Sequence, residues 1–247
     1  MAERRGTVFL LLGMLAWIVA AVVGTLAMWG ILALVSRILA PDVVAEPGRL
    51  VYLLLGAFGF HGTLILGALR QGRRSTGGDW REGVGARRIL HQGWIAVFCM
   101  LTIGWLIVAT ALTAAIPALR DYLKSMSPEF LLSDLGDANS AILALLILLT
   151  VVLAPVAEEF FFRGWLWEAL RRRGRTVTTT ACLTAVPWLL LHGIESPGRI
   201  LLLVPAAVIF SFARQMGGGV LASLTVHVTN NLSVVLVQAA AMIFGHR

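Results

Sequence analysis

Long apolar runs divide this chain of 247 residues, most of them about as long as a membrane is thick. A helix needs about 20 consecutive apolar residues to cross a bilayer, and its backbone polar groups must be satisfied within the segment. The predicted spans are 7–36, 50–69, 94–116, 140–170, 176–192, 200–212 and 219–244. The sixth is short and contains Pro205, so we expect it to be kinked or only partly inserted. The predicted fold class is all-α, a polytopic transmembrane helix bundle of about seven spans.

The composition excludes a soluble protein. Hydrophobic residues make up 58% of the chain and charged residues 13%, whereas soluble domains carry about 25% charged residues. A net charge of +7 would suggest nucleic-acid binding in a soluble protein, but membrane proteins collect Arg and Lys in their cytoplasmic loops. We therefore expect the lipid bilayer as a partner and no nucleic acid. Cys99 and Cys182 lie in apolar runs and indicate neither a disulfide nor a metal framework.

The distribution of Lys and Arg predicts the orientation. If the amino terminus is cytoplasmic, the arginine-rich stretches 70–88 and 171–175 lie inside, and cations inside outnumber those outside. Arg supplies every cation except Lys124, which is typical of a GC-rich bacterial genome. The predicted location is the inner (plasma) membrane, and the side of the carboxyl terminus depends on whether 200–212 crosses fully. Segment 72–86, rich in Gly and Arg, predicts a solvated connector.

We expect two parts in the chain. The amino-terminal part, 1–139, holds three spans and the basic connection, and the part 140–247 holds four spans with ionisable groups inside them. The fourth span contains Glu158, Glu159 and Arg163, although one charge at a helix centre costs at least about 2.5 to 3.5 kcal/mol. Glu159 and Arg163 are at i,i+4 and predict an ion pair. Glu158 lies on a different face and is left available for chemistry.

Three further polar residues lie in later spans. His192 ends the fifth span, and His227 and Asn231 share one face of the last span at i,i+4. At 1.5 Å per residue, Glu158 and His192 lie roughly 20 and 24 Å from the cytoplasmic edge. We therefore expect a water-filled cavity among the last four spans. Each residue alone would be explained by interhelical hydrogen bonding or a structural ion pair, but together they favour a functional site.

These residues fall into three ordered motifs. The first is Glu158-Glu159-Phe-Phe-Phe-Arg163, the second places Trp188 four residues before His192, and the third places His227 four residues before Asn231. This set, over roughly 140–235, resembles the CAAX protease and bacteriocin-processing family of intramembrane endopeptidases. That family includes the type II CAAX prenyl endopeptidases and abortive-infection proteins. It commonly has Phe where this chain has Trp188.

The resemblance implies a protease that cuts a membrane-associated protein or peptide. By resemblance, Glu158 with His192 would activate water, and His227 with Asn231 would stabilise the oxyanion. Glu159, Arg163 and Trp188 would support the site. The resemblance gives no role to His61, His91 or His246, which lie outside the motifs.

Three alternatives stay open at this point. Zinc held by Glu158, His192 and His227 would make the chain a metalloprotease, but the sequence has no HExxH pair, so we expect no cofactor. A non-catalytic immunity or scaffold protein could keep the same fold. A proton-coupled transporter could use buried Glu and His, although no internal repeat is evident. The sequence leaves the substrate, its lipidation and the oligomeric state open.

Overall fold

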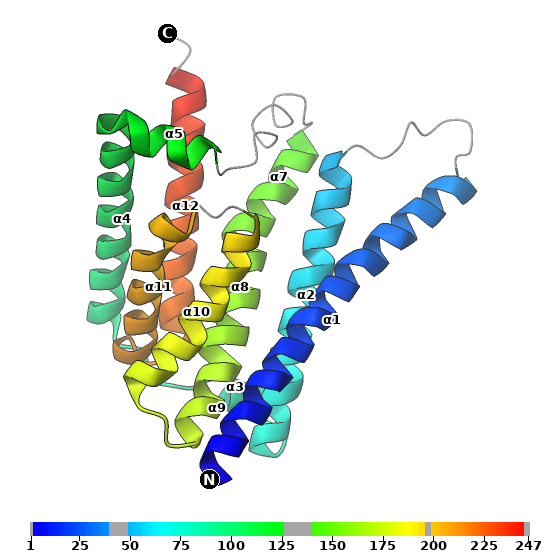
Figure 1. The fold of residues 1–247 in the computed structure, drawn as a ribbon, viewed down its shortest axis with the longest axis vertical. Helices are drawn as coiled ribbons and strands as arrows, with labels where there is room; N and C mark the ends of the chain where they lie inside the picture. Colours follow the sequence, from blue (N-terminus) through cyan, green and yellow to red (C-terminus); the bar gives the residue numbers. More distant parts are fainter. Residues whose placement is uncertain (1, 40–48, 126–139, 196–198, 245–247) are drawn as a thin grey trace.

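A computed structural model describes residues 2–39, 49–125, 140–195 and 199–244 of the chain. These residues form helices and no strand, which confirms the all-α prediction (Figure 1). Helices long and apolar enough to cross a membrane cover Gly6–Val35, Val51–Thr76, Gln92–Ala115, Ser140–Arg172 and Val220–Ala240. The apolar helices Val177–Gly193 and Ile200–Met216 are shorter. The chain is therefore a multi-pass membrane protein, and the helices at its predicted fifth and sixth spans are shorter than the other five.

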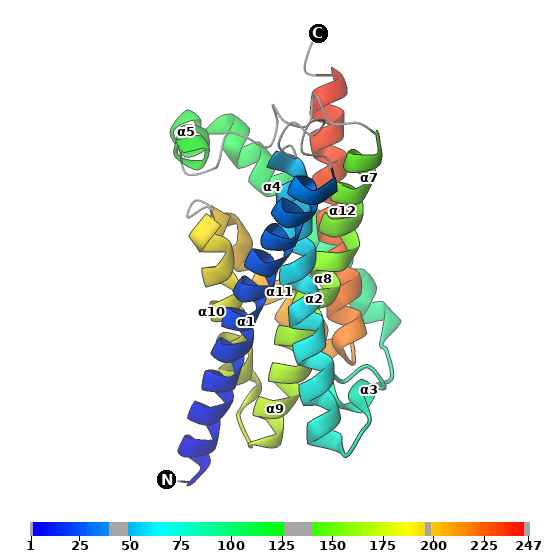
Figure 2. The same ribbon diagram turned by 90° about the vertical axis from the view of Figure 1, so that its right-hand side faces the viewer.

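The long helices run roughly along one axis of the bundle (Figures 1 and 2). The first three are α1 (Ala2–Leu39), α2 (Arg49–Thr76) and α4 (Gln92–Ala115), and the last three are α10 (Val177–Glu195), α11 (Arg199–Met216) and α12 (Val220–Phe244). The amino terminus lies at the lower end of Figure 1 and the carboxyl terminus at the upper end. The connections that follow α2 and α9 (Trp167–Arg172) also lie at the lower end, so the arginine-rich stretches gather beside the amino terminus.

Helices from both predicted parts pack against each other. α1 packs along α2, and α2 contacts the middle of the fourth span. α4 packs against α11 and α12. The centre is filled by large buried side chains, among them Phe161, Phe162, Trp188 and Phe210. Because α2 lies directly against the fourth span, the amino-terminal part can contribute to any site there.

The fourth span is not the uninterrupted α-helix that its hydropathy suggested. It consists of α7 (Ser140–Leu148), η1 (Leu149–Leu153), α8 (Ala154–Glu158), η2 (Glu159–Leu166) and α9, in which η1 and η2 are π-helical. Pro155 explains η1, because proline has no N–H and its ring clashes with the carbonyl four residues earlier. The wider turn relieves that clash, and such π-segments occur frequently at functional sites.

The connection after α2 is mostly exposed, as expected for segment 72–86, but part of it is buried. α2 continues to Thr76, the short helix α3 (Trp80–Gly83) follows, and Val84 is fully buried. Gly72 and Gly83 pack backbone to backbone, because a Cβ on Gly83 would lie 2.4 Å from the Gly72 backbone. Because glycine has no side chain at these two positions, the connection packs closely against the end of α2. Helix α5 (Pro117–Ser125) was also not expected.

Candidate active site

Glu158 is the only acid of the fourth span that faces several imidazoles within the described part of the chain. It ends α8, and its side chain is 11% exposed. His61 Nε2 and His192 Nε2 lie 3.7 and 3.9 Å from its Oε1 atom, and His227 Nε2 lies 3.9 Å from its Oε2 atom. These gaps exceed a direct hydrogen bond, and polar groups at such spacing are commonly bridged by water.

The three imidazoles share one orientation. The Nδ1 atom of His61 lies 2.8 Å from Ala57 O, and that of His192 lies 2.9 Å from Trp188 O. The Nδ1 atom of His227 lies 3.0 Å from Glu159 Oε1. Carbonyl and carboxylate oxygens only accept, so each Nδ1 carries a proton, and Nε2 of each ring, which points toward Glu158, is an unprotonated acceptor whenever that ring is neutral. The carboxylate therefore faces three ring nitrogens that can exchange protons with it.

The two oxygens of Glu158 have different surroundings. Oε2 accepts a hydrogen bond from the indole N–H of Trp188, which is 1% exposed, and His227 beside it is also buried. Oε1 lies between His61 and His192, whose side chains are 15% and 26% exposed. One oxygen is thus fixed by a buried donor, and the other points toward the accessible side of the site.

Glu159 lies beside Glu158 in sequence but has a different environment. It is fully buried, its Oε1 lies 3.4 Å from Arg163 Nη1, and the same oxygen accepts the Nδ1–H of His227. The ion pair expected from the i,i+4 spacing is present in the structure. A carboxylate bonded to one ring nitrogen fixes the tautomer and orientation of that imidazole. Glu159 therefore sets the direction of His227.

Arg163 is also fully buried and is held largely by aromatic faces. Its Cζ lies 4.8 Å from the centroid of the Trp188 ring and 5.8 Å from that of Phe210. None of its side-chain nitrogens has a hydrogen-bond partner among the described residues, so Glu159 and the two rings supply its compensation. The Phe210 ring also stacks on His227 at 4.4 Å. The Glu159–Arg163 ion pair thus contacts the same side of the site as Trp188 and His227.

Asn231 lies beside the turn that precedes Glu158. Its Nδ2 donates to the backbone O of Thr150 at 2.9 Å, and its Oδ1 accepts from Asn230. In the i→i+5 pattern of η1, the Thr150 carbonyl faces Pro155, which has no N–H to offer. Asn231 satisfies that carbonyl. In the described contacts it touches the turn before Glu158 and not the carboxylate.

His61 is the site residue that the sequence analysis missed. It lies on α2, so the site includes a helix from outside the last four spans, where the cavity was expected. The three motifs did not extend to this helix, and nothing in the sequence pairs α2 with the fourth span. One signal was present: His61 is the only Asp, Glu, His, Lys or Arg in the stretch 51–69, and such residues inside spans are rare and face the bundle interior.

The side chains around Glu158 are more widely spaced than the ligands of a zinc site. Zinc bonds to His nitrogen at about 2.0 Å and to carboxylate oxygen at about 2.0 to 2.2 Å, so ligand atoms of one tetrahedral site lie about 3.3 Å apart. The separations around Glu158 are longer, and no group of three His, Cys, Asp or Glu among the described residues could hold a metal ion. The residues in this arrangement do not fit the zinc alternative.

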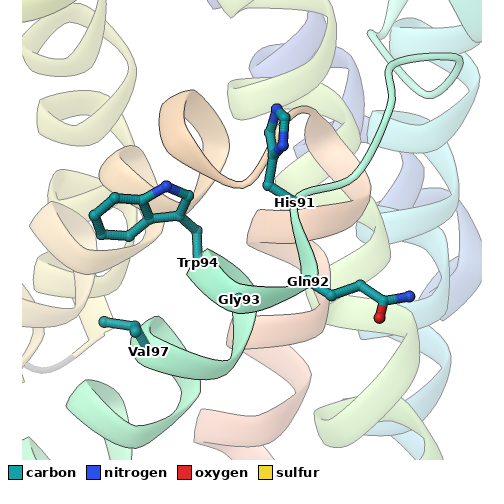
Figure 3. Close-up of a pocket in the computed structure, with 5 residues that line it drawn as sticks. All are labelled: His91, Gln92, Gly93, Trp94 and Val97. Atoms are coloured by element: carbon teal, nitrogen blue, oxygen red, sulfur yellow. The ribbon is translucent and has the colours of Figure 1, made fainter.

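Two cavities lie elsewhere in the molecule. One of about 580 Å³ is lined by His91, Gln92, Gly93, Trp94 and Val97 at the start of α4 (Figure 3). The other, of about 700 Å³, has an arginine-rich wall and also includes His91. Neither is lined by Glu158, His61, His192 or His227. The first carries a single titratable side chain, so the Glu158 cluster has the stronger claim to chemistry.

The comparisons with known proteins agree with the motifs. Residues 140–233 match the family model described as "Rce1-like: Type II CAAX prenyl endopeptidase Rce1-like". No curated protein and no solved structure was found to match the chain. The matched segment contains Glu158, His192, His227 and Asn231, and it ends far from His61 in sequence. This match agrees with the resemblance: residues 140–233 of the chain are similar to the Rce1-like type II CAAX prenyl endopeptidases.

Proposed function

We propose that this protein is an intramembrane endopeptidase in which Glu158 is the general base. The observation that supports this most strongly is the environment of Glu158: one oxygen is fixed by Trp188, and the other faces two part-exposed imidazoles. A carboxylate in that position can bind a water molecule and accept its proton. A general base contributes about 10² to 10⁴ to a hydrolytic rate.

The proposed reaction needs only water and a peptide bond. Water is held by Glu158 Oε1 and His192 Nε2, loses a proton to Oε1, and its oxygen bonds to the carbonyl carbon of the substrate. The carbonyl electron pair moves to oxygen and forms the tetrahedral intermediate. When that intermediate collapses, the C–N bond breaks, the electron pair goes to nitrogen, and the amine leaves with the proton taken from water.

His227 is the proposed stabiliser of the oxyanion. Its Nδ1–H is used by Glu159, so Nε2 can donate to an oxyanion only when the ring is an imidazolium. The carboxylates of Glu158 and Glu159 lie on either side of this ring, 3.9 and 3.0 Å from its two nitrogens. One well-placed oxyanion donor is worth about 10² to 10³ in rate. Asn231 contributes indirectly in this proposal, by holding the η1 turn that precedes Glu158.

The proposed substrate is a membrane-associated protein or peptide. The site lies within the helical bundle of a multi-pass protein, so a cleavable segment reaches it from the bilayer or its interface. The proposed location is the inner (plasma) membrane of a bacterium with a cytoplasmic amino terminus. The support for this orientation is the gathering of Arg-rich connections at the end of the bundle where the amino terminus lies.

Mass spectrometry of membrane peptides tests the proposal in cells. Cells carrying the wild-type chain are compared with cells carrying Glu158→Gln, and with Glu82→Gln cells as a control on the exposed helix α3. We expect one or more membrane-associated peptides to remain uncut only in the Glu158→Gln cells. Identical peptide profiles in all three strains would instead favour the non-catalytic immunity or scaffold protein.

Chelation separates the proposal from the zinc alternative. The purified wild-type protein is assayed on such a peptide before and after treatment with a strong zinc chelator. We expect the cleavage rate to be unchanged. Loss of cleavage that added zinc restores would replace the metal-free mechanism with a zinc-dependent one.

A further inference from the structure

His61 is placed at Glu158 by a helix that the family match does not include. It lies within the apolar span Val51–Thr76, where an ionisable side chain is costly and normally marks a functional pathway. Its Nδ1–H is fixed by Ala57 O, and its ring packs edge-on against Phe60 with centroids 5.4 Å apart. The ring is therefore held in one orientation by its own helix.

That orientation directs His61 at the reactive oxygen. Of the three imidazole nitrogens around Glu158, His61 Nε2 is the nearest, at 3.7 Å from Oε1. His192 Nε2 approaches the same oxygen from α10 at 3.9 Å. Oε2 is already engaged by Trp188. Oε1, which takes the proton from water in the proposed function, thus lies between two unprotonated imidazole nitrogens on different helices.

The reaction gives two such nitrogens separate tasks. One must hold the attacking water beside Oε1. The other can carry the proton from Oε1 to the leaving nitrogen, because an amine leaves the tetrahedral intermediate only when its nitrogen is protonated. His192 comes from the matched segment, which also carries His227, the proposed oxyanion donor. His61 approaches from the opposite part of the chain and has no other assigned task.

We propose that His61 is the proton donor to the leaving amine, so that the amino-terminal part completes the active site. This inference rests on the proposed function. Glu158 Oε1–H passes its proton to His61 Nε2, and the ring becomes an imidazolium that keeps its Nδ1–H on Ala57 O. As the C–N bond breaks, its electron pair goes to nitrogen, which takes the proton from Nε2. His61 returns to its neutral form and Glu158 to a carboxylate.

Leaving-group dependence tests this role. The probe is a synthetic copy of the peptide whose cleavage separates wild-type from Glu158→Gln cells, prepared with either an amide or an ester at the scissile bond. An alkoxide leaves without prior protonation far more readily than an amide nitrogen. We expect His61→Gln to lower the amide rate by about 10² to 10⁴ and the ester rate by less than about tenfold.

Two further variants make the result specific. His192→Gln, which removes the water-holding nitrogen, is expected to lower both rates to a similar extent. His91→Gln at the start of α4 is expected to change neither, since His91 lines the cavities away from the site. Equal loss of amide and ester cleavage in His61→Gln, or no loss of either, would overturn the role of His61. Undiminished cleavage by Glu158→Gln would overturn the proposed function itself.

A second measurement needs no substrate. Nitrogen-15 spectra of histidine-labelled protein in lipid vesicles distinguish the two neutral tautomers, and His61→Gln assigns the His61 signals by their loss. We expect neutral His61 with the proton on Nδ1 and a bare Nε2. A proton on Nε2 instead would contradict the placement of His61 as an acceptor beside Glu158 and end the inference. Retained insertion and thermal stability of His61→Gln confirm that the variant reports on chemistry.

Discussion

Two glutamates of the fourth span are buried among basic side chains, and they are bonded in different ways. Glu168, near the lower end of the bundle, accepts from Arg214 at 2.6 Å and from Arg88 at 2.9 to 3.2 Å. Glu158, ten residues earlier in sequence, has one hydrogen-bond donor, Trp188, and otherwise faces imidazole nitrogens 3.7 to 3.9 Å away.

The comparison separates a carboxylate bonded by guanidinium groups from one that no guanidinium contacts among the described residues. At Glu168, which lines the arginine-rich cavity, guanidinium groups donate to both oxygens and tie three segments together. At Glu158, no guanidinium touches the carboxylate among the described contacts, because Arg163 is paired with Glu159 instead. A buried acid can therefore act as a base when its neighbours exchange protons with it and when one of its oxygens is free to bind water.

Glu159→Gln is expected to have the largest effect on stability. Removing one member of a buried ion pair typically costs about 3 to 5 kcal/mol, because the partner charge stays buried and uncompensated. Here Arg163 would keep only the rings of Trp188 and Phe210. The free energy of unfolding of the purified protein measures this. A change below about 1 kcal/mol would contradict a structural role for Glu159.

Glu168→Gln is expected to destabilise the protein by about 3 kcal/mol, the lower end of that range. The Arg88 side chain is 56% exposed and can return to water, whereas Arg214 is 3% exposed and cannot. Cleavage per folded molecule should stay near the wild-type value.

Glu158→Gln serves as the matched variant: its amide oxygen can still accept from Trp188, so its stability should change by less than about 1 kcal/mol. A larger loss of stability in Glu158→Gln than in Glu168→Gln would contradict the structural role of Glu168.

Trp188→Phe is expected to act on rate more than on stability. It keeps a ring beside Arg163 and removes the N–H that fixes Glu158 Oε2. A hydrogen bond to a charged group is worth about 1.5 to 3 kcal/mol, so the cleavage rate should fall roughly ten- to hundredfold. Steady-state kinetics on the peptide measure it. Wild-type kinetics in Trp188→Phe would show that the indole N–H does not orient the base.

Asn231→Ala is expected to have the smallest effect of the four. It leaves the carbonyl of Thr150, which lies within a membrane-spanning helix, without this donor, and that costs about 1 to 3 kcal/mol of stability. Stability and cleavage rate are measured together. A rate loss of about 10² to 10³ with unchanged stability would instead return Asn231 to the oxyanion role that the motif suggested.

The sequence predicted what depends on local pattern. Hydropathy located the spans, and the i,i+4 spacing of Glu159 and Arg163 anticipated their ion pair. Long-range packing was not predictable in the same way. No motif connects α2 to α8, so His61 was left without a role, although it approaches Glu158 more closely than His192 does.

The remaining differences have local causes that hydropathy does not express. Pro155 widens the turn before Glu158 and has no N–H for the Thr150 carbonyl, which accepts a hydrogen bond from Asn231 instead. Gly72 and Gly83 allow close backbone packing, so Val84 is buried although the composition of this connection predicted that it is solvated. In both cases the signal was a single residue type whose consequence depends on a distant partner.

The central claim is that the Glu158 carboxylate activates water, and one rate tests it most directly. Purified Glu158→Gln protein in lipid vesicles is compared with wild type on the amide peptide, after both samples give the same unfolding midpoint. The expected result is a rate at least about 10² lower, down to background, in a folded protein. Cleavage at the wild-type rate by that folded variant would contradict the account.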